Sequence, residues 1–334
     1  MFKVQSSELT NIGIGSVFII AAILKLISID EFEIYIYSFD IFSFLLTTFV
    51  SRFIIIGEFV LGLFLILKIN YKITWRLAFI SLILFTLFLI YVAIFRNDDN
   101  CHCFGELVEL SPLESIVKNL ILIFLLLLSQ KPKAKSQKPA TNSQQPTAKV
   151  LVVLLSCSLV VFILTPPDSI YKMIYSTEKE VSTLDLYESF DEVVKIDFTE
   201  EGVEFDTITN FQENETQLIA VVSAGCKYCK LGLKKLSLMQ KNEDISLDDV
   251  DVFIWGSPEG IIDFREETMT EDFGYWHIMP NKAIEVTYGR FPVFIMIKEK
   301  DIIKVGDFRD LDDAFFETQN LRISESQNFE ILNF

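Results

Sequence analysis

The chain has few of the residues that build metal centres or disulfide frameworks. Its 334 residues include only five cysteines and two histidines. Four cysteines form two close pairs, Cys101 with Cys103 and Cys226 with Cys229. Cys157 stands alone in an apolar run, where we expect a packed and inert side chain. Two short-spaced pairs indicate redox or metal chemistry rather than a framework of structural disulfides.

Basic residues are also scarce, and they are unevenly distributed. The net charge is −17, and from Asp168 onward 35 acidic residues face only 16 basic ones. An acidic, polar C-terminal part argues against binding to nucleic acid or to an anionic membrane surface. It is compatible with a soluble domain outside the cytoplasm.

Before residue 166 the chain is dominated by long apolar runs. Half of all residues are hydrophobic, 31 are Phe and mean hydropathy is +0.38. Runs of this length predict membrane spans. The predicted spans are residues 12–29, 53–67, 77–95, 112–128 and a shorter fifth at 150–164. The first has no small-residue cleavage site and is expected to be an anchor, and residues 30–51 are expected at the membrane interface.

The distribution of Lys and Arg predicts the orientation of these spans. The connection after the second span carries Lys68, Lys72 and Arg76 without an acid, and the stretch 131–149 is Lys-rich and equally free of acids. Both should face the cytoplasm. Five spans then place the N-terminus inside, and both cysteine pairs outside, on the oxidising side of the membrane.

The C-terminal part combines strand and helix patterns around a Cys-x-x-Cys sequence. Buried strands are predicted at residues 218–223, 250–255 and 291–297, with a hairpin partner at 301–306, and helices at 227–240, 261–269 and 310–318. This order places Cys226 at a helix N-terminus, where backbone N–H groups stabilise a thiolate, and Cys229 one turn on. The alternative is half of a zinc site, for which His277 is the one obvious additional ligand here.

The order of strand, Cys226-Lys227-Tyr228-Cys229, helix, strand, helix and Arg290-Phe291-Pro292 resembles the thioredoxin-like family over about residues 211–316. The resemblance implies that Cys226 is the nucleophile, that Cys229 resolves the mixed disulfide and that Pro292 is a cis-proline facing them. The chain departs from the commonest pattern in having Gly225, not Trp, before the first cysteine.

The membrane part resembles the MauE/DoxX family of redox-associated membrane proteins over about residues 10–130. The specific feature is the loop Cys101-His102-Cys103-Phe104-Gly105, supported by Lys25, residues 32–37, Gly57-Glu58 and Gly62. The resemblance implies a role in the maturation of disulfide-containing proteins. The family is associated with methylamine utilisation, of which this sequence gives no independent sign.

Two further sets of polar residues belong to the membrane part. Cys-x-Cys suits electron relay better than bracing, although Cys101, His102 and Cys103 could alternatively bind copper(I) or zinc. Ionisable residues within a span, here Glu58 and Lys25, indicate a functional site. The alternative is that each side chain lies close enough to the membrane interface to stay hydrated. Glu58 and Lys118 lie six residues inside the same end of two predicted spans, so we expect an ion pair between them.

The sequence thus predicts a membrane α-helical bundle, four spans plus a fifth, followed by a soluble α/β thioredoxin-like domain. The expected parts are residues 1–130 (bundle), 131–149 (cytoplasmic linker), 150–166 (fifth helix) and 167–334 (extracytoplasmic domain) in the inner membrane. The expected activity is thiol–disulfide relay, with metal handling as the alternative. Expected partners are the lipid bilayer and envelope protein thiols or disulfides, with no nucleic acid. No cofactor is required, and a quinone is compatible but not indicated.

Overall fold

The computed structural model contains two compact units, Met1–Pro167 and Asp168–Phe334, which are described separately. The structure describes residues 2–96, 98, 100–108, 110–129, 146–175, 193–199, 202–209, 216–242, 245, 250–298 and 301–316. Most of the predicted linker at 131–149 lies outside these residues.

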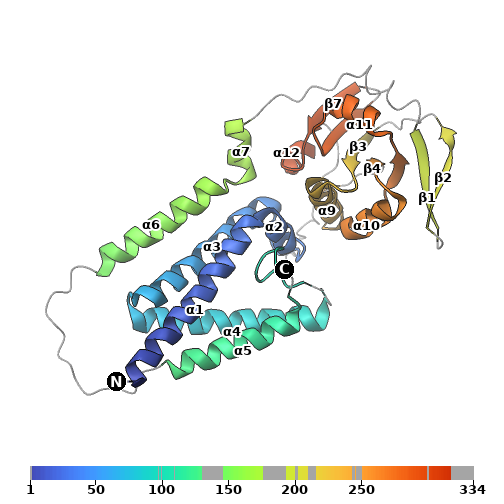
Figure 1. Ribbon diagram of the computed structural model, residues 1–334. Coiled ribbons are helices and arrows are strands. Elements are labelled where there is room, and N and C mark those ends of the chain that lie inside the picture. Colours follow the sequence, from blue (N-terminus) through green and yellow to red (C-terminus); the bar gives the residue numbers. More distant parts are fainter. Residues whose placement is uncertain are drawn as a thin grey trace, which may run out of the picture. The chain divides into compact units, whose positions relative to one another are not determined.

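The first unit is a helical bundle with an inverted distribution of polarity. Its helices are α1 (Phe2–Ile27), α2 (Ile29–Tyr37), α3 (Phe44–Leu67), α4 (Tyr71–Phe95), α5 (Pro112–Leu128) and α6 (Pro146–Leu164). Figure 1 shows α1 alongside α3 and α4 alongside α5. Large apolar side chains such as Leu84, Phe124 and Leu155 are exposed, whereas Lys25 and Arg52 are buried. An apolar exterior around a polar interior is the arrangement expected of a protein whose solvent is lipid.

Length and composition identify the spanning helices. Within the described residues, Glu8–Ile27, Phe44–Leu67 and Tyr71–Phe95 are long and apolar enough to cross a membrane, and Ala148–Leu164 is a shorter apolar helix. The 17 residues of α5 match the predicted fourth span, with Pro112 at its start. The prediction of a membrane bundle is therefore confirmed.

The bundle is closely packed where α1 crosses α3. A Cβ atom added to Gly15 would lie 2.7 Å from the carbonyl oxygen of Gly62, and one added to Gly62 would lie 2.7 Å from that of Gly15. Small residues of this kind let two membrane helices approach backbone to backbone. Gly62, one of the residues that carry the resemblance to the MauE/DoxX family, is thus required by packing.

The predicted start of the second span is wrong. The sequence places it at residue 53, after Arg52, but α3 begins at Phe44, and residues 29–37 form the short helix α2. Arg52 is only 2% exposed and forms an ion pair with Glu33 of α2. A charged residue with a buried partner can lie inside a helix, and the sequence alone does not show that partner.

The second unit contains a seven-stranded sheet of order β2-β1-β5-β4-β3-β6-β7. The strands are β1 (Val193–Thr199), β2 (Gly202–Thr209), β3 (Thr216–Ser223), β4 (Val250–Trp255), β5 (Gly274–His277), β6 (Val293–Lys298) and β7 (Asp301–Gly306). The pairs β3–β4 and β4–β5 are parallel, and the pairs β3–β6 and β6–β7 are antiparallel. The mixed central sheet and its helices form the predicted thioredoxin-like domain.

Among the described residues of this unit, the helices are α7 (Asp168–Tyr175), α9 (Lys227–Lys241), α10 (Pro258–Thr268), α11 (Pro280–Thr287) and α12 (Asp313–Phe316). Buried side chains of β3, β4 and β6, among them Val221, Phe253 and Ile295, form a core with Ala283 and Val286 of α11. This core fixes the end of β3, from which the Cys-x-x-Cys sequence leads into α9.

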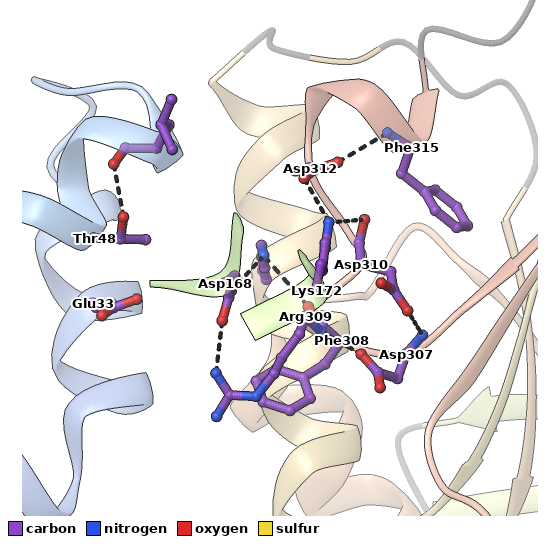
Figure 2. Close-up of polar contacts among 12 residues, drawn as sticks. Glu33, Thr48, Asp168, Lys172, Asp307, Phe308, Arg309, Asp310, Asp312 and Phe315 are labelled. Atoms are coloured by element: carbon purple, nitrogen blue, oxygen red, sulfur yellow. Dashed lines mark hydrogen bonds and ion pairs between the residues drawn. The ribbon is translucent and has the colours of Figure 1, made fainter. Parts of the chain in front are cut away.

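Charged side chains connect α7 to the rest of the second unit (Figure 2). The carboxylate of Asp168 accepts a hydrogen bond of 2.6 Å from Arg309 and lies 3.9 Å from the Nζ atom of Lys235. Lys172 forms a 2.6 Å ion pair with Asp312 and donates to the carbonyl oxygen of Asp310. The segment following Pro167 therefore begins with a helix that is part of the folded domain, where the sequence predicted no element.

Candidate functional site

The Cys-x-x-Cys pair lies where β3 turns into α9. Cys226 is the N-cap residue of α9, with an extended backbone, and its sulfur accepts a hydrogen bond of 3.3 Å from the backbone N–H of Cys229. Cys226 is partly exposed and Cys229 is fully buried. One sulfur is therefore accessible to a partner, and the second is one helical turn away from it.

The surroundings of the two sulfurs shift their pKa values in opposite directions. A hydrogen bond from the Cys229 thiol, assisted by the backbone N–H groups of Cys229 and Tyr228, lowers the pKa of Cys226 to about 6. Burial, together with the hydrogen bond to Cys226, raises the pKa of Cys229 above its ordinary value. At neutral pH the accessible sulfur is thus a thiolate and the buried one a thiol, the distribution that attack on a disulfide requires.

The Pro292 loop faces the Cys226 sulfur. The Phe291–Pro292 peptide bond is cis, and the Cys226 sulfur lies 4.0 Å from the carbonyl oxygen of Phe291. Tyr228 is 45% exposed and its ring stacks on Phe308 with centroids 5.0 Å apart. Tyr228, two residues after Cys226, thus presents exposed aromatic surface for contact with a partner segment.

The second cysteine pair is joined in the loop between α4 and α5. Cys101 and Cys103 form a disulfide, and each residue is 2% exposed. They pack with Leu89, and Phe85 and Phe104 cover the cluster. The backbone N–H of Cys101 donates to the carbonyl oxygen of Leu110, which closes the base of the loop. The sulfurs are thus held in an apolar environment at one end of the bundle.

Gly105 holds this loop against α1. Its φ is +68°, and an added Cβ atom would lie 2.1 Å from the hydroxyl of Ser28 and 2.8 Å from the carbonyl oxygen of Leu24. The Ser28 hydroxyl accepts a hydrogen bond of 3.0 Å from the N–H of Glu106. Only glycine fits both the backbone conformation and the space, which explains the Gly of the Cys-x-Cys-Phe-Gly sequence.

The His102 side chain contacts Tyr35 and Glu106. Its ring packs on Tyr35 with centroids 4.3 Å apart, and its Nδ1 atom lies 3.0 Å from the Glu106 carboxylate. Within the described ranges, no three His, Cys, Asp or Glu side chains come close enough to hold a metal ion. The Cys101, His102 and Cys103 ligand set proposed as the alternative is therefore not assembled in this structure.

The predicted ion pair between Glu58 and Lys118 is wrong. Glu58 binds Lys25 of α1 instead, with the Lys25 Nζ atom 2.7 and 2.8 Å from its two carboxylate oxygens. Lys118 lies over the ring of Phe104, 4.3 Å from its centroid. Equal depth in two helices does not fix which faces meet, and α3 packs along α1.

Lys25 is enclosed with its partner near the disulfide loop. It is 1% exposed, so it does not extend its ammonium group to the interface. Its Nζ atom lies 5.7 Å from the ring centroid of Phe32 and 5.8 Å from that of Phe85. Phe85 also packs against the Cys101–Cys103 cluster. One aromatic ring thus contacts both the buried ion pair and the disulfide cluster.

Sequence reasoning missed Ser115, which the structure places against the disulfide. The Ser115 hydroxyl lies 3.0 Å from the Cys101 sulfur, and the residue is completely buried. Ser115 occupies the first turns of α5, whose N-terminus is closed by a capping box between Ser111 and Glu114. The capping signal is readable in the sequence, but the loop that brings Cys101 to Ser115 is not.

Comparisons with known proteins agree with this two-part architecture. Residues 3–130 match the family model described as methylamine utilisation protein MauE. Protein TlpB from Flavobacterium psychrophilum is 29% identical over 325 residues, covering 86% of this chain and 85% of that protein. No solved structure matches. The chain therefore joins a MauE-like membrane domain to a thioredoxin-like domain, and its likeness to TlpB extends over most of both chains.

Proposed function

We propose that the protein is a membrane-bound thiol–disulfide oxidoreductase of the cell envelope. In this proposal the Cys226/Cys229 dithiol and the Cys101–Cys103 disulfide exchange electrons within one chain. The thioredoxin-like domain in turn exchanges disulfides with other envelope proteins. The bundle lies in the inner membrane with both cysteine pairs on its outer side, as the distribution of Lys and Arg predicts.

The observation that carries the proposal is the environment of Cys226. A partly exposed sulfur with a pKa of about 6, next to a buried thiol and the Pro292 loop, is equipped for nucleophilic attack on a disulfide. A purely structural cysteine needs neither property. In the structure Cys226 and Cys229 are free thiols and Cys101 and Cys103 form a disulfide, so one pair can donate electrons and the other can accept them.

The exchange balances without a further reactant. The Cys226 thiolate attacks one sulfur of the Cys101–Cys103 disulfide, forming a mixed disulfide and releasing the other sulfur as a thiolate. Cys229 then loses its proton and attacks Cys226, which releases the second loop sulfur. The Cys226/Cys229 pair is oxidised by two electrons, the loop pair is reduced by two, and the proton from Cys229 ends on a loop thiolate.

A trapping experiment tests the proposal. In the full-length Cys229→Ser variant the resolving sulfur is absent, so a mixed disulfide between Cys226 and a loop cysteine should accumulate. Non-reducing peptide mapping of membranes identifies the linked peptides. Cys157→Ser, which changes a buried cysteine outside both pairs, serves as the matched control. Adducts of Cys226 exclusively with other proteins would show that the two pairs are not coupled.

The ligand-binding alternative makes a different prediction. A metal-handling protein would purify with copper or zinc in proportion to its intact cysteine pairs, and would not form the Cys226 adduct. The described residues offer no three-ligand cluster that favours this alternative. Metal analysis of the protein and of its Cys101→Ser variant measures it directly.

A further inference from the structure

The two sulfurs of the loop disulfide have different hydrogen-bond environments. The Cys101 sulfur lies 3.0 Å from the hydroxyl oxygen of Ser115. A disulfide sulfur carries no proton, so the Ser115 hydroxyl must be the donor. Ser115 is completely buried, and its side chain has no other hydrogen-bond partner in the described part of the chain. Its one acceptor, a neutral disulfide sulfur, is weak, and a thiolate at the same position would accept this hydrogen bond more strongly.

The Cys103 N–H and the Cys103 sulfur add to the difference between the environments of the two sulfurs. The backbone N–H of Cys103 lies 3.4 Å from the Cys101 sulfur and donates to it. The Cys103 sulfur instead lies 3.7 Å from the carbonyl oxygen of Cys101. Two donors favour negative charge on the first sulfur, whereas a carbonyl oxygen disfavours it on the second.

We infer that Cys103 is the sulfur attacked during exchange, that Cys101 is the sulfur released as a thiolate, and that Ser115 is the catalytic residue that stabilises it. This inference deepens the proposed function and rests on its exchange chemistry. The attacking thiolate forms a bond to Cys103, the Cys101–Cys103 bond breaks, and the electron pair stays on Cys101. The Ser115 hydroxyl and the Cys103 N–H then donate to a full negative charge instead of a neutral sulfur, so their stabilisation grows along the reaction.

The position of Ser115 suits this role. Ser115 follows the capping box of Ser111 and Glu114, which satisfies the end of α5 and fixes its first turns. Positive potential at the N-terminal end of α5 adds to the stabilisation of a nearby thiolate. Both cysteines are 2% exposed, so a nucleophile reaches Cys103 only after the loop moves, whereas the leaving sulfur can keep its buried donor.

Glutathione provides a test that is independent of the thioredoxin-like domain. The purified full-length chain with Cys226→Ser and Cys229→Ser keeps the loop disulfide and lacks the internal nucleophile. It is incubated with reduced glutathione, quenched with N-ethylmaleimide and mapped by peptide mass spectrometry. The expected product has glutathione on Cys103 and the maleimide label on Cys101. Glutathione on Cys101, or an equal distribution, overturns the assignment, as does a loop disulfide that does not react at all.

Variants of Ser115 test its part in the step. Ser115→Ala should slow the formation of the mixed disulfide roughly 10-fold, the value of one hydrogen bond to a charged group. Ser115→Thr retains a hydroxyl and should restore most of the rate. Ser129→Ala removes another buried hydroxyl, near the opposite end of α5, and should leave the rate unchanged. An unchanged rate in Ser115→Ala overturns the role of Ser115.

A second measurement separates chemistry from folding. In Cys103→Ser protein, the rate at which iodoacetamide alkylates Cys101 is followed against pH, with and without Ser115→Ala. Loss of the donor should move the alkylation profile to higher pH, a change that a merely structural role would not produce. An unmoved profile contradicts the inference. Because Cys226 takes no part, failure of the intramolecular relay would leave both results interpretable.

Discussion

Lys25 and Glu58 form an ion pair in the interior of the bundle, in which the Lys25 Nζ atom contacts both carboxylate oxygens, at 2.7 and 2.8 Å. The Lys25 side chain is 2% exposed and that of Glu58 16%. Removing one partner leaves the other charge without its counter-charge in a poorly solvated place, which typically costs about 3–5 kcal/mol. Removing both avoids that penalty. The pair connects α1 to α3 and lies near Phe85, which packs against the disulfide cluster.

A double-mutant cycle on detergent-solubilised protein checks this relationship. Lys25→Met and Glu58→Gln should each destabilise the bundle strongly, and the double variant should be less destabilised than the sum of the two. The matched control is Lys68→Gln with Glu58→Gln, since Lys68 pairs with Glu8 and both of those side chains are largely exposed. Thermal unfolding of the helical signal is the measurement. Additive effects for Lys25 and Glu58 would contradict the pairing.

Arg52 should determine how firmly α6 is attached to α3. Its guanidinium donates to the carbonyl oxygens of Thr165, at 2.7 Å, and Pro166, at 3.0 Å, while pairing with Glu33. These carbonyls lie at or just beyond the C-terminal end of α6, where helix carbonyls have no partner of their own. Arg52→Gln should therefore increase hydrogen exchange in residues 160–165 and lower the melting temperature.

The exposed pair of Lys68 with Glu8 provides the control for Arg52. Both side chains are 46% exposed, so Lys68→Gln should change stability by less than about 1 kcal/mol. Equal effects of Arg52→Gln and Lys68→Gln would argue that the Arg52 contacts contribute nothing to the attachment of α6.

How far the sequence predicts this protein depends on how local each signal is. The strands β3, β4, β6 and β7 and the helix α9 were predicted within a few residues, because apolar runs bounded by Cys226, Pro292 and Gly306 carry their own boundaries. The hairpin of β1 and β2 was missed, since Val193–Thr199 alternates buried and exposed positions only partly. Helix α7 was missed too, because charged contacts with distant residues hold it.

In the membrane unit, too, contacts between distant residues could not be predicted from local sequence patterns. The sequence places Glu58, Lys118 and the Cys101–Cys103 loop at one end of the bundle, but the partner of Glu58 depends on the rotation of each helix about its axis. The close approach of Gly15 and Gly62 brings α1 and α3 together and puts Lys25, not Lys118, beside the carboxylate. Ser115 likewise becomes a candidate only when the loop is folded over α5.

The Asp168 contacts predict that α7 stabilises the second unit. Asp168→Asn weakens the 2.6 Å pair with Arg309 and removes the negative charge 3.9 Å from the buried Lys235 ammonium. The expected result is faster cleavage by protease within residues 168–175 and a lower melting temperature of the domain. Lys172→Gln, which affects the more exposed pair with Asp312, should have a smaller effect. Equal protection in wild type and Asp168→Asn would contradict the role of this carboxylate.

The orientation predicted from Lys and Arg has its own test. With the N-terminus in the cytoplasm and five spans, everything after Pro167 lies outside. Protease added to intact spheroplasts should then release a fragment that contains the Cys226 peptide. Lysed spheroplasts provide the control for a protease-resistant domain. Protection of the fragment in intact cells, together with its release after lysis, would show that the five-span arrangement is wrong.

The acidity of Cys226 predicts how reactivity and stability depend on pH. Its pKa of about 6 lies below the ordinary thiol value, so alkylation of reduced protein by iodoacetamide should be half-maximal near pH 6. Between pH 6 and the ordinary thiol pKa the folded domain binds fewer protons at this site than the unfolded chain. The stability that the thiolate contributes is therefore present at higher pH and is lost as the pH falls through 6.

Two substitutions of Cys229 identify the cause of this acidity. The largest contribution is the hydrogen bond from the Cys229 thiol, so Cys229→Ala should move the alkylation midpoint of Cys226 to higher pH. Cys229→Ser keeps an O–H donor at the same position and should stay closer to the wild-type midpoint. Cys226→Ser should abolish the pH-dependent gain in stability. If Cys229→Ala and Cys229→Ser give the same midpoint as wild type, the backbone N–H groups of Tyr228 and Cys229 alone set the acidity of the nucleophile.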